Sequence, residues 1–187
     1  MSDDASPSFD FAEPTRLTVG TEGLPGRRMF FLQAREGPLL ATLKMEKIQV
    51  AALGSWIAKT LEDLPRPGHL PDDSELEPET FLQPAWAVGS LGGSYDPETD
   101  RILLVAAELP SGDDEDDDDP TSDESALLGA AGATARIRAT REQMAALAIR
   151  ATRLVDSGRP PCPLCGYPLD PIGHQCPRTN GFRPPNL

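Results

Sequence analysis

The sequence predicts an α+β fold in which two βββα repeats share an antiparallel sheet or partial barrel, followed by a small C-terminal zinc-binding knuckle. Apolar strand patterns and an amphipathic helix occur in the same order in residues 15–62 and 84–158. All three cysteines and one of the two histidines lie close together near the C-terminus. Only 39% of the residues are hydrophobic and 20 are prolines, so part of this 187-residue chain should lie outside the core.

The first repeat begins with strands and ends with a helix. Three apolar segments, separated by the turn sequences GLPG and GP, are expected to be strands: residues 17–20, 28–34 and 39–45. From residue 46 the apolar period becomes helical, with four side chains on one face: Val50, Leu53, Ile57 and Leu61. Three prolines stop this helix, and residues 63–80 are expected to be an acidic, proline-rich connector.

The second repeat restates this order. Its expected strands are residues 86–89, 101–107 and 133–139. Residues 95–100 form the expected hairpin connection, and the glycine-rich residues 89–94 are assigned to its rim, because no GK[ST] follows them to make a phosphate loop. A helix from Arg141 to Gly158 presents four apolar side chains: Met144, Leu147, Ala151 and Val155. The motif QxAAL occurs in both helices, which favours duplication, and Trp56 and Trp86 are expected to anchor the core.

Two polar segments are expected to be disordered. They are the tail at residues 1–14 and an acidic loop at residues 109–126, in which residues 113–124 carry nine acidic side chains and no basic one. The formal net charge is −13, whereas residues 127–187 carry eight arginines against three carboxylates, a net of +5. The acidic loop is therefore either a solvating linker or a segment that folds over the arginine-rich end.

The C-terminal segment, residues 159–187, carries the strongest chemical signal. Its motif CPLCGYPLDPIGHQC supplies the ligands for a closed tetrahedral Cys3His site with structural zinc: Cys162, Cys165, His174 and Cys176. A redox CxxC dithiol is the rival interpretation, but prolines flank the pair and leave no helix N-terminus to lower a thiol pKa. Three reduced structural cysteines are the third interpretation.

Five arginines in the last third are candidate anion ligands: Arg136, Arg138, Arg141, Arg178 and Arg183. Alternate residues of a strand share a face, so Arg136, Arg138 and Arg141 could form a phosphate-binding strip. A solubilising exposed strand is the simpler alternative. The other histidine, His69, lies in the acidic connector and is expected to be solvated.

Composition and motifs narrow the classes of function. No apolar run approaches the roughly 20 residues that span a bilayer. The N-terminus lacks the signal-peptide pattern, so we expect a cytoplasmic protein without membrane partners. No acid–base pair stands out, which favours a non-catalytic binding or regulatory adaptor with a protein partner. An enzyme with its active site between the repeats, and an anion- or nucleic-acid-binding module using the arginine-rich third, remain as alternatives.

Several stretches resemble a known family. They are RMFFLQAR at residues 28–35, KIQVA at residues 47–51 and the C-terminal strings GRPPCPLCG, PLDP, GHQCPR and NGFR. Together they resemble an actinobacterial family catalogued as domain of unknown function 3090, over nearly the whole chain apart from the tail and the acidic linkers. The resemblance implies a cytosolic protein with a zinc motif on the four C-terminal ligands and no established activity. Gene neighbours that resemble a phosphatidylinositol-kinase-like protein and a histidine phosphatase imply a partner or adaptor role.

Overall fold

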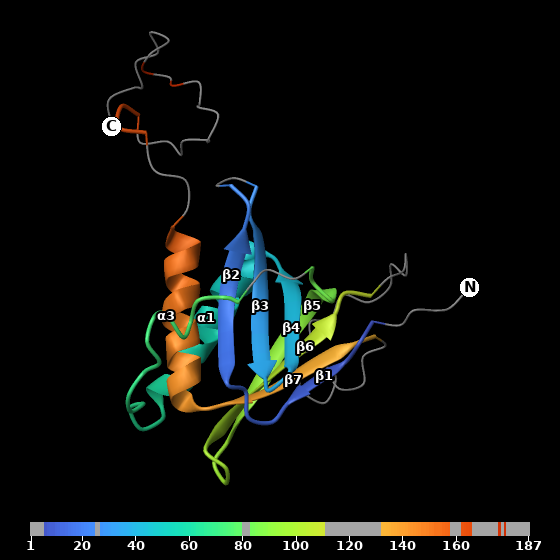
Figure 1. Cartoon of the computed structure of the whole chain (residues 1–187). Coiled ribbons are helices and arrows are strands. Elements are labelled where there is room, and N and C mark those ends of the chain that lie inside the picture. The colour runs from blue at the N-terminus through green and yellow to red at the C-terminus, as the bar shows by residue number, and fades with distance from the viewer. Residues whose placement is uncertain are drawn as a thin grey trace, which may run out of the picture.

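The computed structural model describes residues 6–24, 27–79, 83–110, 132–157, 162–165, 176 and 178. Within these ranges seven strands form one sheet, and two helices pack against each other beside it (Figure 1). The strands are β1 (Phe9–Phe11), β2 (Arg16–Glu22), β3 (Met29–Glu36), β4 (Leu39–Met45), β5 (Trp86–Asp96), β6 (Arg101–Glu108) and β7 (Thr134–Ala139). The helices are α1 (Lys47–Glu62) and α3 (Arg141–Asp156).

The strand order is β1-β7-β6-β5-β4-β3-β2, and the sheet is mixed. Strands β2-β3-β4 and strands β5-β6-β7 are antiparallel within each group. The two groups join through a short parallel pairing of β4 with β5, and β1 pairs parallel with β7. The α+β class is therefore confirmed, but a wholly antiparallel sheet is wrong. Helix α1 and the connector after it form a crossover between β4 and β5, and a crossover places successive strands parallel.

Strand β1 lies in the segment that was expected to be a loose tail. Phe9 and Phe11 stand opposite Ala135 and Ile137 of β7, and Phe11 is fully buried. Trp86 Nε1 donates a hydrogen bond of 2.8 Å to the carbonyl of Pro7, which fixes the chain just before the strand. The expectation of a disordered tail is thus wrong for Phe9–Phe11, whose apolar–polar–apolar alternation is the strand signal.

The glycine-rich residues 89–94 lie inside β5, so their assignment to the rim of a hairpin is also wrong. A Cβ atom on Gly93 would come within 2.6 Å of the ring of Trp56 and 2.4 Å of the carbonyl oxygen of Leu103. Glycine is required here because the indole of α1 packs directly on the strand. The hairpin turn follows at residues 97–100, within the connection expected at residues 95–100.

In both helices the third residue is a glutamine that caps the first turn. Gln49 Oε1 accepts a hydrogen bond of 2.8 Å from the amide of Glu46, and Gln143 Oε1 accepts one of 3.0 Å from the amide of Thr140. These bonds satisfy backbone donors that a helix N-terminus otherwise leaves without partners. The helices approach closely at Gly54, where an added Cβ would lie 3.3 Å from the Cβ of Ala151.

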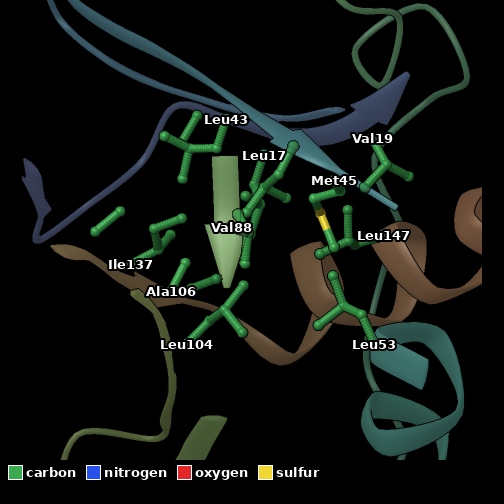
Figure 2. Close-up of a cluster of buried hydrophobic side chains, with 14 of the residues drawn as sticks. Leu17, Val19, Leu43, Met45, Leu53, Val88, Leu104, Ala106, Ile137 and Leu147 are labelled. Atoms are coloured by element: carbon green, nitrogen blue, oxygen red, sulfur yellow. The ribbon is translucent and has the colours of Figure 1, made fainter. Parts of the chain in front are cut away.

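One hydrophobic core is shared by strands from both antiparallel groups and by both helices (Figure 2). The side chains labelled in Figure 2 meet in this cluster: Leu17, Val19, Leu43, Met45, Leu53, Val88, Leu104, Ala106, Ile137 and Leu147. Trp86 is buried in the core and Trp56 packs against it half-buried, so the expected tryptophan anchors are confirmed.

The connector after α1 covers polar groups on the other face of the β2-β3-β4 group. Gln33 is buried there and donates a hydrogen bond of 3.2 Å to Thr42 Oγ1. The backbone amide of Glu79 donates to Gln33 Oε1 at 2.8 Å, and Thr18 Oγ1 donates to the carbonyl of Leu76. These bonds satisfy buried polar groups that would otherwise destabilise the sheet. The expected acidic loop lies outside the described residues from residue 111 onward.

Candidate metal centre

Three cysteines of the C-terminal segment lie together. The Sγ atoms of Cys162, Cys165 and Cys176 are all within 4.8 Å of one another, and those of Cys162 and Cys176 are 3.9 Å apart. A disulfide would need about 2.05 Å between sulfurs, so this pair is not oxidised. Thiolates placed tetrahedrally around a zinc ion at about 2.3 Å stand about 3.8 Å from each other. The cluster is therefore compatible with a metal ion.

The local chain explains how the first two sulfurs meet. A turn at residues 163–165 follows Cys162, and Pro163 restricts φ at its first position. Two intervening residues are the spacing with which a tight turn brings a cysteine pair to one metal. Cys162 and Cys176 are only 6% and 5% exposed, whereas Cys165 is half-buried. Two of the three clustered cysteines are thus buried, and the third is partly exposed.

The structure brings together three of the four predicted zinc ligands. The fourth, His174, lies outside the described residues, so its part in the site stays a prediction. In the portion of the chain with a described structure, this trio is the one group of three or more His, Cys, Asp or Glu side chains at metal-ligating distances.

The candidate anion ligands do not form one strip. Arg136 and Arg138 alternate with buried residues of β7 and share its face opposite the core, as expected. Arg138 Nη1 donates to Asp10 Oδ1 at 2.6 Å, so it already has a carboxylate partner in β1. Arg141 begins α3 instead of extending the strand. Arg178 is exposed, and Arg183 lies outside the described residues.

Arg141 belongs to a polar network that sequence reasoning missed. Its Nε and Nη2 atoms donate to the two carboxylate oxygens of Asp100 at 2.8 and 2.9 Å. Tyr95 donates its hydroxyl proton to the same carboxylate at 2.9 Å, and Asp100 adopts a positive φ of 52° in the hairpin turn. The network ties the β5–β6 hairpin to the start of α3. Arg141 and Asp100 are 41 residues apart in the sequence, so no local pattern reveals that they interact.

The ion pairs predict how stability depends on pH. Hydrogen bonds from Arg141 lower the pKa of Asp100, and those from Arg35 lower the pKa of Glu79. A carboxyl group with a lowered folded-state pKa stabilises the fold above its unfolded pKa of about 4, and this contribution disappears as pH falls through the folded value. Urea unfolding should therefore show lower stability at pH 3 than at pH 7, and Asp100→Asn should flatten that dependence. Glu62→Gln, at an exposed carboxylate of α1, is the control and should not; an equal effect of both substitutions would contradict the prediction.

The fold and the cysteine cluster define an α+β protein with a mixed sheet and a candidate metal centre near its C-terminus. The chain belongs to the family described as protein of unknown function (DUF3090), which matches residues 9–176. The match extends from β1 to Cys176 and so includes all three clustered cysteines, while Arg178 and Arg183 lie beyond it. Comparisons with curated proteins and with solved structures find no match. None of the described helices combines the length and apolar character needed to cross a membrane.

Proposed function

We propose that the protein is a non-catalytic binding protein, or adaptor, whose C-terminal segment is organised by structural zinc on Cys162, Cys165, His174 and Cys176. The observation that carries the proposal is the convergence of three sulfurs, with 3.9 Å between Cys162 and Cys176. Thiolates and an imidazole in a tetrahedron are the ligand set that zinc prefers. Four protein ligands leave no open position for a substrate, so the role of the metal is structural. A reducing compartment keeps such thiols available, which supports a cytoplasmic location.

The carboxyl groups with shifted pKa among the described residues do not offer a general acid. Hydrogen bonds lower the pKa of four carboxyl groups: Glu79, Asp96, Asp100 and Glu142. Each of these groups is therefore more firmly ionised at neutral pH, whereas a general acid needs a pKa raised toward the working pH. Their partners are arginines, one tyrosine, two threonines and backbone amides, so these carboxylates support the fold.

We further infer that the body arose by duplication of a βββα unit. The order β2-β3-β4-α1 is followed by β5-β6-β7-α3, and the QxAAL motif starts at the third residue of both helices. The capping glutamines also act alike across the two units. Gln49 Nε2 donates to the carbonyl of Val88 in the first strand of the second unit, and Gln143 Nε2 donates to the carbonyl of Pro14, just before the first strand of the first unit. This reciprocal pattern supports a pseudo-twofold relation.

Native mass spectrometry of protein purified without chelator or nickel tests the zinc proposal. We expect one zinc ion per chain, and we expect His174→Ala to weaken its retention against a chelator. His69→Ala is the matched control, because it removes the only other histidine and should leave zinc in place. A metal-free wild-type chain with reactive thiols would contradict the proposal and favour the redox dithiol.

A further inference from the structure

The three cysteines of the candidate metal centre differ in their contact with solvent. Cys162 and Cys176 are only 6% and 5% exposed, whereas Cys165 is partly exposed. Leu164, its neighbour in the same turn, is 50% exposed, so the turn at residues 163–165 faces solvent. Susceptibility of a cysteine to oxidation rises with its exposure. Cys165 is therefore the cysteine of the three that a small dissolved oxidant approaches most closely.

A second sulfur lies within reach of Cys165. The Sγ atoms of Cys162, Cys165 and Cys176 are all within 4.8 Å of one another, and none of the three is in a disulfide. A disulfide needs about 2.05 Å between sulfurs, so closing one requires an approach of less than about 3 Å. Cys162 immediately precedes the turn that contains Cys165, whereas Cys176 follows Cys162 by 14 residues. The pair at this turn is the one that the local chain already holds together.

Metal ligation would keep these sulfurs in the form that reacts with an oxidant. The thiolate is the nucleophilic form of cysteine, and a thiol that binds a metal ion is deprotonated. The described residues 162–165 form a turn and not the start of a helix, so a helix dipole does not activate the pair. The thiolates would thus come from ligation, which joins the reactivity of the sulfurs to the state of the metal site.

We propose that Cys165 is an oxidation site for hydroperoxides, and that its disulfide with Cys162 releases the metal ion. The inference rests on the proposed zinc site and names the regulation of that site. Oxidation removes two of the four proposed ligands, and the remaining pair, His174 and Cys176, is too few for a closed tetrahedral site. The C-terminal segment then loses the folding free energy that ion binding supplies.

The oxidation takes place in two steps. The Cys165 sulfur attacks one peroxide oxygen and the O–O bond breaks, which leaves a sulfenic acid and a hydroxide that takes a proton from solvent to become water. The Cys162 sulfur then attacks the sulfenic sulfur. An S–S bond forms, the S–O bond breaks, and a second hydroxide leaves as water after taking a proton. The two thiolates together lose two electrons, and the peroxide gains them.

Titration of the full-length, zinc-loaded chain with hydrogen peroxide tests the inference. We expect about ten molar equivalents of peroxide to release the zinc, detected with a chromogenic chelator, with two thiols lost for each ion. Tandem mass spectrometry should place the disulfide between Cys162 and Cys165. Dithiothreitol with added zinc should restore the original mass and zinc content. Hydrogen exchange should increase in the C-terminal segment and stay unchanged in β3 and β6.

Replacing single sulfurs with imidazole identifies the cysteine that reacts first. Cys165→His keeps four ligands for zinc but removes the partly exposed cysteine, so peroxide should release zinc at least about tenfold more slowly. Cys176→His is the matched control, because it also keeps four ligands but retains the Cys162–Cys165 pair. Its release rate should stay within about twofold of the wild type. Trapping of sulfenic acid with dimedone in the wild-type chain needs no substitution and should label Cys165 first.

Several results would overturn the inference. They are zinc that stays bound in excess peroxide, a first oxidation product that does not include Cys165, or equal protection by the two histidine substitutions. Zinc content before oxidation separates the two proposals. A zinc-loaded chain that resists peroxide contradicts the oxidation site alone. A chain purified without zinc contradicts the zinc site, and the same disulfide mapping then decides the oxidation site: the Cys162–Cys165 disulfide supports it, and its absence contradicts it.

Discussion

Replacing Cys165 with serine is expected to abolish stoichiometric zinc binding and to unfold residues 159–183, while the sheet and both helices stay folded. Structural zinc contributes about 10–16 kcal/mol of binding free energy in small modules, and that energy is folding free energy. Cys165 is the half-buried member of the cluster, so serine fits sterically and the substitution tests the ligand role of the sulfur. Native mass spectrometry reports the zinc. Hydrogen exchange reports which amides lose protection, with loss expected in the C-terminal segment and not in β3 or β6.

Leu164→Ser is the matched control for this substitution. Leu164 is adjacent to Cys165 and 50% exposed, so serine there should leave the zinc in place. Retention of zinc by Cys165→Ser would remove this sulfur from the site. Loss of protection throughout the body would show that the C-terminal segment packs into the core, and the boundary near residue 159 would then be wrong.

Local patterns predicted most of the fold. The expected helix faces are buried at Val50, Leu53 and Ile57, and the strand expected at residues 39–45 is β4 with the same bounds. Such elements follow from periodicity, which a sequence displays directly. The pairing of β1 with β7 depends on contacts such as Phe9 with Ala135, which no local pattern encodes. The parallel joint between β4 and β5 was missed for the same reason.

In the candidate site, too, local features could be predicted from the sequence, whereas contacts between distant residues could not. The spacing of Cys162 and Cys165 is a local property, and Cys176 follows within the same short segment, so sequence alone was enough to predict the sulfur cluster. The arginines were harder to interpret, because their partners come from distant elements. Arg138 meets Asp10 and Arg141 meets Asp100, and these ion pairs occupy groups that the sequence offered as anion ligands.

Replacing Leu147 with alanine is expected to lower the free energy of unfolding of the body by about 2–5 kcal/mol, the usual cost of a cavity left by a buried leucine. Leu147 is 0% exposed and lies in the core shared by the strands of both groups (Figure 2). Urea unfolding measures the change. Ile149→Ala is the matched control, because Ile149 is on the same helix but 42% exposed, and it should change stability by less than about 0.5 kcal/mol.

The agreement between different probes of Leu147→Ala unfolding is as informative as the midpoint of the transition. Trp56 and Trp86 report the packing of α1 and β5, while circular dichroism reports the whole sheet. Because Leu53 and Leu147 belong to one core cluster, both probes should shift together in Leu147→Ala and in Leu53→Ala, as they do in a two-state transition. Separate transitions for the two probes would mean that the two strand groups unfold independently. In that case the core between them would contribute little to stability, and the prediction of one cooperative transition would be wrong.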